Sequence, residues 1–360
     1  MKKENISIYE FNKNMSEIPV ILFGAGGFLD DMVEYMPWFF KTLKIKVIVD
    51  NRFDSYSDGK EICGTVYEIR TPEILKDLHG TYNLLIMNFK WTADIYDQIK
   101  KMNLSDNITC YSFTEMLSIS SGTGFPVSNT VSHHIDKTIH SFWFSGEEKP
   151  DDYKRCIESW YKHCPDFTIK EWDLNTYTTS NDFFNGAIKN RKWPFASDYA
   201  RLDTIYRLGG VYLDMDVEVK KNYSELLSCN SFFSFDTIGL IDLGAGFGAV
   251  KGNLLVKRLK DIYENRKFTS ADSLPAAAQP RIIRRIFAEY GLKLDGNFEE
   301  KDGNRFYPRC YFAPEDCYTY SDVLHRGVEY SVHHYLSGWR PSEFRLDNMA
   351  KHRKLLDEFS

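Results

Sequence analysis

The sequence contains no apolar run long enough to span a membrane, and residues 1–19 lack the apolar core of a secretory signal. It also lacks an excess of basic residues, since 45 Lys and Arg stand against 51 Asp and Glu, so we expect no broad surface for nucleic-acid phosphates. None of its seven cysteines has the Cys-x-x-Cys spacing, which argues against a zinc site or a disulfide framework and favours reduced thiols. These absences predict a cytoplasmic protein without a membrane anchor, although docking at the inner face of a membrane is compatible with them.

What the sequence does contain is a regular alternation of strand-like and helix-like stretches in its first third. Apolar stretches that predict strands lie at 19–27, 44–51, 82–89 and 107–113. Because strands joined by helices form parallel sheets, we predict an α/β protein whose N-terminal domain, residues 1–118, is Rossmann-like. The segment 119–130 is rich in Ser, Gly and Thr and is predicted to be a linker, so 131–360 forms a second domain.

A glycine-rich turn, FGAGG at 23–27, follows the first predicted strand. Its glycines match the first two of the Gly-x-Gly-x-x-Gly pattern that binds dinucleotides, but Leu29 occupies the third position. Asp50 ends the next strand, near where a ribose-binding acid would lie. Two interpretations stay open for the N-terminal domain: a structural or docking module, which we favour, and a nucleotide-binding module.

The second part of the chain contains an unusual acidic stretch, VYLDMDVEV, directly after a helix that ends at a Gly-Gly pair. Alternate residues of a strand share a face, so Asp214, Asp216 and Glu218 are expected on one side and the apolar residues on the core side. A solvated edge strand is one explanation. However, three like charges without an interleaved cation repel one another, and carboxylate oxygens suit Mg²⁺ or Mn²⁺.

The helix before this stretch carries Asp198 and Arg201, which are three residues apart and therefore neighbours on the helix surface. An ordinary surface ion pair is one explanation for them. Their place in the helix that leads to the acidic strand suggests another, in which a forked donor and an acceptor hold sugar hydroxyls.

Five stretches of the second part resemble, in order, motifs of glycosyltransferase family 32, the DXD-containing sugar transferases. They are IHSFWFSG, CIESWYKHCPDF, EWD, ASDYARLDTIYRLGGVYLDMDVEV and HHYLSGW, and they span about residues 137–340. The family includes bacterial capsular and lipopolysaccharide transferases and is distantly similar to the glucosylating domains of clostridial toxins. The resemblance implies a GT-A type nucleotide-sugar transferase domain behind the Rossmann-like one.

The resemblance also implies roles for individual residues. The metal, Mn²⁺ or Mg²⁺, would be bound by Asp216, His334 and Asp214. The donor sugar would be held by Asp198, Arg201 and Asp214, with Gly246 in a glycine-rich loop close to it. The nucleotide would be bound by Phe142, Trp143, Asp214, Ser337 and Trp339. The implied catalytic set is Asp198, Arg201, Asp214 and Asp216.

Some of these positions keep a simpler interpretation. Trp143 could be a core residue, and His333 is as well explained by a structural role as by a functional one. Asp242 is a candidate for acceptor contact. The opening motif, DKTIH, differs from the Pro-Lys-Ile-Ile-His of the family, and the toxin relatives carry a carboxylate at the position of His334, which leaves the identity of the metal open.

The implied activity is metal-dependent transfer of a sugar, with retention of configuration, from a nucleotide-sugar, preferably a UDP-sugar. The acceptor would be a glycan or lipid-linked saccharide in bacterial surface polysaccharide synthesis, such as capsule synthesis. The alternatives are a nucleotide-sugar hydrolase and a non-catalytic nucleotide-sugar-binding protein. The sequence predicts neither the donor sugar nor the linkage.

Overall fold

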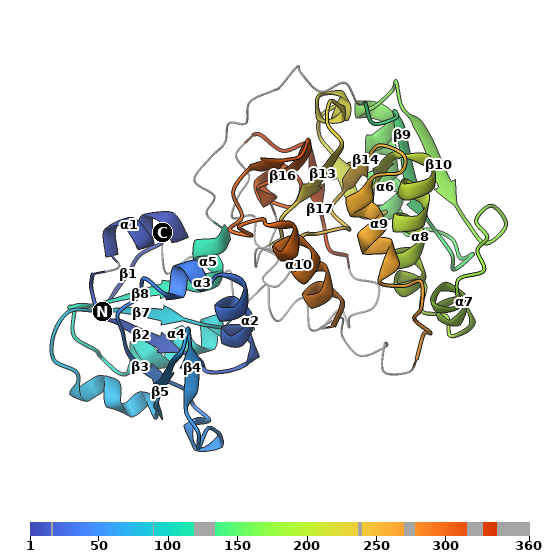
Figure 1. Cartoon of the computed structure of the whole chain (residues 1–360). Helices are drawn as coiled ribbons and strands as arrows, with labels where there is room; N and C mark the ends of the chain where they lie inside the picture. The colour runs from blue at the N-terminus through green and yellow to red at the C-terminus, as the bar shows by residue number, and fades with distance from the viewer. Residues whose placement is uncertain are drawn as a thin grey trace.

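The computed structural model describes residues 1–15, 17–88, 90–118, 134–236, 240–269, 278–314 and 327–336. The described chain forms one large sheet in each half (Figure 1), which confirms the predicted α/β class. The predicted linker, 119–130, lies outside the described residues. Among the described helices, none combines the length and the apolar character needed to cross a lipid bilayer.

The N-terminal sheet is parallel throughout, as the alternating pattern predicts. Its strands, in spatial order, are β1 (Lys2–Lys3), β8 (Ile108–Ser112), β7 (Tyr82–Ile86), β2 (Val20–Phe23), β3 (Ile45–Val49) and β6 (Ile69–Arg70). The four central strands are the four predicted ones. The edge strands β1 and β6 are too short to produce a recognisable alternation.

Helices cover both faces of this sheet. On one face, Val20 and Leu22 of β2 pack with α1 (Ile8–Met15), α2 (Gly27–Tyr35), α3 (Pro37–Phe40) and α5 (Phe113–Ser118). On the other face, Ile21 and Phe23 pack with α4 (Thr92–Lys101). This two-sided burial explains why the strands read as continuous apolar runs. A short hairpin, β4 (Lys60–Ile62) and β5 (Thr65–Tyr67), stands apart from the sheet.

The glycine-rich turn after β2 is held by Asp50. One carboxylate oxygen of Asp50 accepts the backbone N–H of Ala25 at 2.8 Å, and the other accepts the N–H of Arg52 at 2.8 Å. Asp50 is buried, so these bonds satisfy a carboxylate that would otherwise be costly inside the protein. This use of Asp50 favours the structural interpretation of the N-terminal half.

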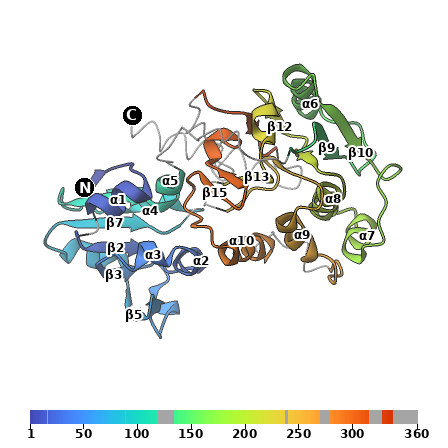
Figure 2. The same cartoon turned by 45° about the horizontal axis from the view of Figure 1, so that its top comes forward.

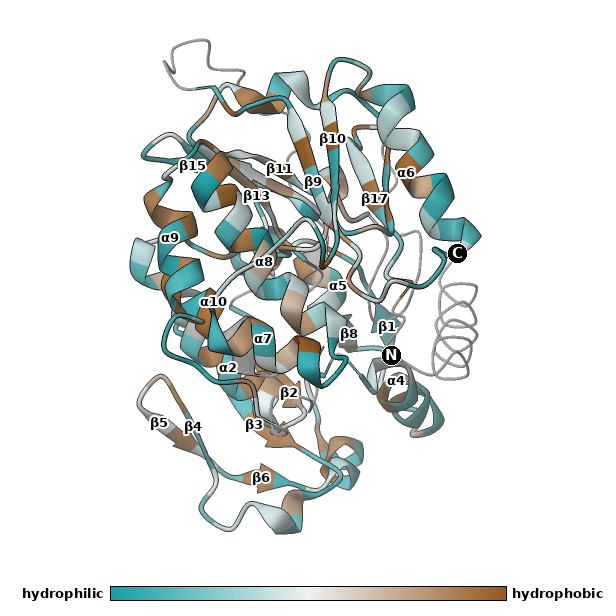
Figure 3. Ribbon diagram, turned by 90° about the vertical axis from the view of Figure 1, so that its right-hand side faces the viewer, coloured by the Kyte–Doolittle hydropathy of each residue, from teal (hydrophilic) through white to brown (hydrophobic). Residues whose placement is uncertain are grey.

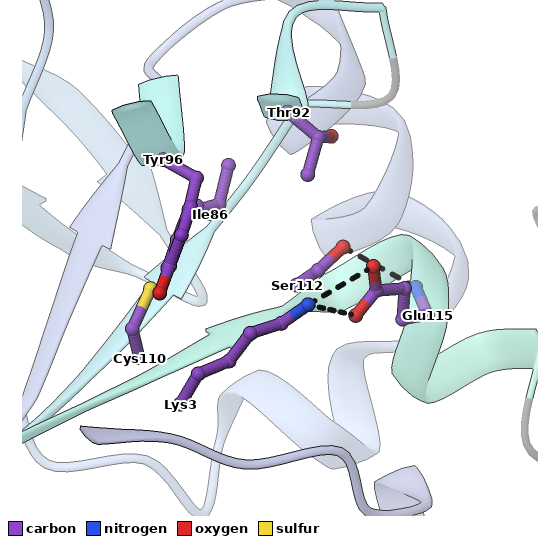
Figure 4. Close-up of a pocket in the computed structure, with 7 residues that line it drawn as sticks. All are labelled: Lys3, Ile86, Thr92, Tyr96, Cys110, Ser112 and Glu115. Atoms are coloured by element: carbon purple, nitrogen blue, oxygen red, sulfur yellow. Dashed lines mark hydrogen bonds and ion pairs between the residues drawn. The ribbon is translucent and has the colours of Figure 1, made fainter. Parts of the chain in front are cut away.

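A small pocket in the N-terminal half lies where β1, β8 and the start of α4 meet (Figure 4). Its lining residues are Lys3, Ile86, Thr92, Tyr96, Cys110, Ser112 and Glu115. The ammonium of Lys3 lies 3.2 Å from the carboxylate of Glu115, and both side chains are almost fully buried. The pocket is therefore spanned by an ion pair that fastens β1 to α5.

The second sheet is mixed. Its strands, in spatial order, are β10 (Thr168–Trp172), β9 (Thr138–Phe142), β11 (Gly210–Tyr212), β14 (Phe247–Ala249), β13 (Ser231–Ser234), β16 (Asn304–Tyr307) and β15 (Glu299–Lys301). The pairs β10–β9, β9–β11 and β13–β16 are parallel, and the others are antiparallel. A separate two-stranded sheet joins β12 (Val217–Val219) to β17 (Ser331–His333).

Helices again lie on both sides of the second sheet. One face is covered by α7 (Asp182–Lys189), α8 (Trp193–Leu208), α9 (Leu254–Asp261) and α10 (Ala278–Tyr290). The other face carries α6 (Asp151–His163), whose Trp160 is fully buried against β12, while most of its outer surface is hydrophilic (Figure 3). The turn from α8 into β11 needs glycine, because Gly209 and Gly210 have φ values of +77° and +101°.

The two halves touch near α10. This helix lies beside α2 in both Figure 1 and Figure 2. The hydroxyl of Tyr9 donates to the carboxylate of Asp295, and Leu240, from the loop that follows β13, packs against the core of the N-terminal half.

His140 of β9 is buried in an arrangement that requires a neutral ring. Its Nε2 donates to the carbonyl of Gly209 at 3.1 Å, and its Nδ1 accepts the indole N–H of Trp172 at 3.2 Å. Burial lowers the pKa of His140 to about 4. A neutral histidine in the folded state that becomes charged on unfolding makes stability fall as the pH drops from about 6.5 to about 4.

We therefore expect His140→Gln, which cannot ionise, to flatten the acid side of the stability profile. The wild-type protein should lose up to about 3 kcal/mol of unfolding free energy between pH 6.5 and pH 4 through this residue. Urea unfolding at half-unit pH intervals measures the slope, and His79→Gln, at an exposed histidine, is the control. Equal slopes in the wild type and His140→Gln would show that the ring is not the group responsible.

Candidate functional site

The stretch VYLDMDVEV is not one strand, as predicted, but two strands joined by a turn. β11 ends at Tyr212 and β12 begins at Val217, whose N–H bonds to the carbonyl of Asp214 at 3.1 Å. The chain bends because β11 pairs with β9 and β14 in the large sheet, whereas β12 pairs with β17 in the small one. The prediction that the apolar residues of this stretch face the core is confirmed, since Leu213, Met215, Val217 and Val219 are all buried.

The bend brings Asp214 and Asp216 together with His333, the last residue of β17. One ligand atom from each of these three side chains lies within 4.8 Å of the others, and no second group of this kind occurs among the described residues. Oδ1 of Asp216 lies 3.3 Å from Nε2 of His333. Two carboxylates and an imidazole form a donor set suited to Mn²⁺, and the two carboxylates alone suit Mg²⁺. The residues therefore fit a divalent cation.

The pKa values of Asp214, Asp216 and His333 depend on their neighbours in the cluster. Burial and the charge of Asp216 raise the pKa of Asp214, although Arg201 acts in the opposite direction. Burial acts the same way on Asp216, but His333 and the backbone N–H of Leu336 outweigh it and lower the pKa of Asp216. Burial disfavours the imidazolium of His333, yet Asp216 and Asp242 hold its pKa well above the usual value. The carboxylates of Asp216 and Asp242 thus favour positive charge at the position of His333.

Gly244 leaves the space that this cluster needs. A Cβ at this position would lie 2.5 Å from Oδ2 of Asp214 and 3.1 Å from Cε1 of His333, which is too close for ordinary contacts. The carbonyl of Gly244 also accepts the N–H of Asp214 at 3.2 Å. The glycine-rich loop therefore lies directly against the acidic turn.

Arg201 of α8 forms a second group beside the turn. Its Nη2 lies 3.0 Å from Oδ1 of Asp198 and 3.5 Å from Oδ1 of Asp214, and its guanidinium lies 4.7 Å from the ring centre of Tyr212. The hydroxyl of Tyr212 donates to Asp214. Burial raises the pKa of Asp198 to about 6, although Arg201 opposes this shift. The structure thus brings Asp198, Arg201 and Asp214 together, as the sequence predicts.

His334 does not join the three-residue cluster. Its Nε2 lies 3.0 Å from a carboxylate oxygen of Glu218, which also binds Lys220, and its backbone N–H bonds to the carbonyl of Asp216. The reason is strand geometry: successive side chains alternate in direction, so when His333 points to the acidic turn its neighbour points elsewhere. Glu218 likewise lies outside the cluster, contrary to the prediction that the three acidic residues share one face.

Phe142 and Trp143 follow one another at the end of β9 but have different surroundings. Phe142 is buried among aromatic rings of the core, including Tyr212 at 6.0 Å. Trp143 is half-buried, and its indole N–H donates to the carbonyl of Glu147 at 2.7 Å. The ring of Tyr153 lies 5.6 Å from Trp143, and burial together with the charges of Asp216 and Asp214 raises the pKa of Tyr153 to about 12. Tyr153 therefore packs on Trp143 and lies within electrostatic range of the acidic turn.

The remaining predicted residues divide into two kinds. Ser337 and Trp339 lie outside the described residues. Gly246 is described, and a Cβ there would lie 2.8 Å from the side chain of Leu213, so its lack of a side chain serves packing behind the turn.

The sequence did not assign His333, Tyr153, Tyr212 or Gly244 to the site, and it gave Asp242 a different role. Tyr212 could have been suggested by its position two residues before Asp214. Gly244 lies in the glycine-rich loop that the resemblance places close to the sugar, whereas Tyr153 and His333 come from separate elements that no pattern in the sequence joins to the acidic turn.

Comparison with known proteins agrees with this picture in part. Residues 150–233 match the family model described as a glycosyltransferase sugar-binding region containing a DXD motif. An uncharacterized glycosyltransferase of Acanthamoeba polyphaga mimivirus is 27% identical over 107 residues, which cover 28% of this chain and 43% of the viral protein. The chain thus matches less than half of that relative. A solved structure titled PaToxG Glycosyltransferase aligns with a TM-score of 0.35 and 16% identity, covering 44% of this chain and 68% of the other.

Proposed function

We propose that this chain is a metal-dependent glycosyltransferase, which moves a sugar from a nucleotide-sugar donor to a hydroxyl of a saccharide acceptor. The observation that supports it most is the approach of Asp214, Asp216 and His333 to within 4.8 Å of one another. Both aspartates lie in the stretch that matches the DXD-containing family model. The ion pair of Arg201 and Asp198 beside the same turn adds a donor and an acceptor for sugar hydroxyls.

In this proposal Asp214, Asp216 and His333 hold Mn²⁺ or Mg²⁺, and a bound cation would neutralise charge on the diphosphate leaving group. Arg201 donates hydrogen bonds to the donor sugar and Asp198 accepts them. The half-buried ring of Trp143 is available for stacking on the base, which is worth about 1–3 kcal/mol in other proteins. Ser337 and Trp339 stay predicted ligands of the diphosphate.

We further propose transfer with retention of configuration on the face from which the leaving group departs. A double displacement needs a free carboxylate as nucleophile. Among the described carboxylates beside the turn, Asp198 and Asp214 are paired with Arg201 and Asp242 accepts four hydrogen bonds from the protein, which supports a route without a covalent intermediate. We propose a UDP-sugar as the donor. The proposed acceptor is a glycan or lipid-linked saccharide of surface polysaccharide synthesis, and the reaction is placed in the cytoplasm.

The two halves of the chain are proposed as separate domains, 1–118 and 131–360. Each contributes its own sheet, with apolar clusters on both faces. The engagement of Asp50 with the glycine-rich turn supports a structural or docking role for the first domain.

The test is a panel of nucleotide-sugars incubated with the full chain and Mn²⁺, with and without saccharide acceptors. The proposal predicts release of nucleoside diphosphate from one donor class, lost when the metal is chelated, and a glycoside product when the correct acceptor is present. Cleavage at equal rate with every acceptor and no glycoside would identify a hydrolase instead. Donor binding without any cleavage would identify a nucleotide-sugar-binding protein.

A further inference from the structure

Asp242 lies in the loop that follows β13, and its carboxylate contacts the imidazole of His333 on the side away from Asp216. We propose that Asp242 is a positioning residue, which fixes His333 in the tautomer with hydrogen on Nδ1 and so leaves Nε2 able to bind a divalent cation. This inference rests on the proposed function, because it concerns the same cation site.

The ring of His333 stands between two carboxylates. Its Nδ1 lies 3.2 Å from Oδ2 of Asp242, and its Nε2 lies 3.3 Å from Oδ1 of Asp216. A neutral imidazole carries one hydrogen, and the nitrogen that binds a metal must be the bare one. With a cation beside Asp216, the hydrogen therefore belongs on Nδ1, where Asp242 accepts it. Histidine ligands of metals are commonly oriented by such a carboxylate.

Asp242 is itself held firmly. Its Oδ1 accepts the backbone N–H groups of Gly244 at 2.8 Å and Ala245 at 3.0 Å. Its Oδ2 accepts the hydroxyl of Tyr335 at 2.8 Å in addition to the contact with His333. A carboxylate has about four positions at which it accepts hydrogen bonds. All four are used by the protein.

This saturation argues against the role predicted from the sequence, contact with the acceptor sugar. The Asp242 side chain is only 12% exposed, and a sugar hydroxyl would have to displace a donor that the fold supplies. The backbone donors are fixed, and the ring of Tyr335 is 3.9 Å from that of His333. The carboxylate therefore acts on His333 rather than on a substrate.

The substitution Asp242→Asn tests the inference because the amide must choose an orientation. The two backbone N–H groups can only donate, so the amide oxygen should turn toward Gly244 and Ala245. The amide NH₂ then faces His333 and makes Nδ1 the acceptor, which moves the hydrogen to Nε2. We expect the affinity for Mn²⁺ to fall roughly 10- to 100-fold.

Mn²⁺ binding is measured on the full chain by electron paramagnetic resonance, without substrate, so that the result does not depend on turnover. Asp236→Asn makes the same chemical change in the same loop, where the side chain accepts the N–H of Leu240. His334→Gln changes the neighbouring ring, which faces Glu218. Both control variants should bind Mn²⁺ within about twofold of the wild type.

The tautomer is measured separately by long-range ¹H–¹⁵N correlation in histidine-labelled wild-type protein, with His333 assigned from its loss in His333→Gln. The inference predicts the Nδ1–H form for the wild type with Mg²⁺ bound, and this measurement needs no Asp242 variant to fold. If Asp242→Asn binds Mn²⁺ as tightly as the wild type, the positioning role is overturned while the cation site stands. If the wild type binds no Mn²⁺, the proposed metal site falls, and the inference with it.

Discussion

Asp216→Asn should lower metal-dependent turnover by on the order of a thousandfold or more, because it removes one charge from the three-residue cluster at the more enclosed of its two carboxylates. The Asp216 side chain is 11% exposed, its Oδ1 faces His333, and its Oδ2 accepts the N–H of Leu336 at 2.9 Å. An asparagine can preserve one of these contacts, so the fold should survive. Release of nucleoside diphosphate in a Mn²⁺ titration measures the effect.

The matched control is Glu218→Gln. This carboxylate belongs to the same nine-residue stretch but pairs with His334 and Lys220 outside the cluster. It should keep turnover within a few-fold of the wild type. If Glu218→Gln lost as much activity as Asp216→Asn, the assignment of the metal site to the turn rather than to β12 would be wrong.

The second large effect is expected on stability. Arg201→Met should lower the free energy of unfolding by about 3 kcal/mol, because removing the buried guanidinium leaves two part-buried carboxylates uncompensated. The guanidinium is 8% exposed and serves Asp198, Asp214 and the carbonyl of Ser197 at once. Methionine replaces much of the volume and none of the charge. The midpoint of urea unfolding, with circular dichroism as the probe, measures the loss.

Two further variants separate charge from packing in this prediction. Arg258→Met, in an exposed pair with Glu289, should cost no more than about 1 kcal/mol. The double variant Arg201→Met with Asp198→Asn should recover part of the loss, since it removes one of the stranded charges. An unchanged midpoint in Arg201→Met would contradict the idea that this arginine neutralises the carboxylates beside the turn.

Much of the fold could be predicted from the sequence because local patterns carry it. The central strands β2, β3, β7 and β8 are predicted by their apolar runs. The same reasoning failed at VYLDMDVEV, where alternation predicts one strand. The break there arises from pairing partners in two different sheets, β14 and β17, and a local pattern does not report which strand pairs with which.

The site likewise combines residues that local patterns predict with residues that only long-range contacts bring together. Asp198, Arg201, Asp214 and Asp216 are near one another in the sequence, and the structure brings them close together. The choice between His333 and His334 depends on the direction of a strand more than a hundred residues away from the turn, and it could not be predicted. The contact of Asp242 with His333 likewise joins distant loops. Long-range contacts thus decide which of the candidate ligands meet.

The position of Leu240 has a consequence for any attempt to use the second half of the chain alone. Leu240 packs against the apolar core of the first half, and only one residue, Ile241, separates it from Asp242. Cutting the chain between the halves would remove the apolar contacts that Leu240 makes with the first half, and it would loosen the loop that carries Asp242. The first half contributes none of the three proposed metal ligands, yet its removal is expected to weaken the affinity for the metal.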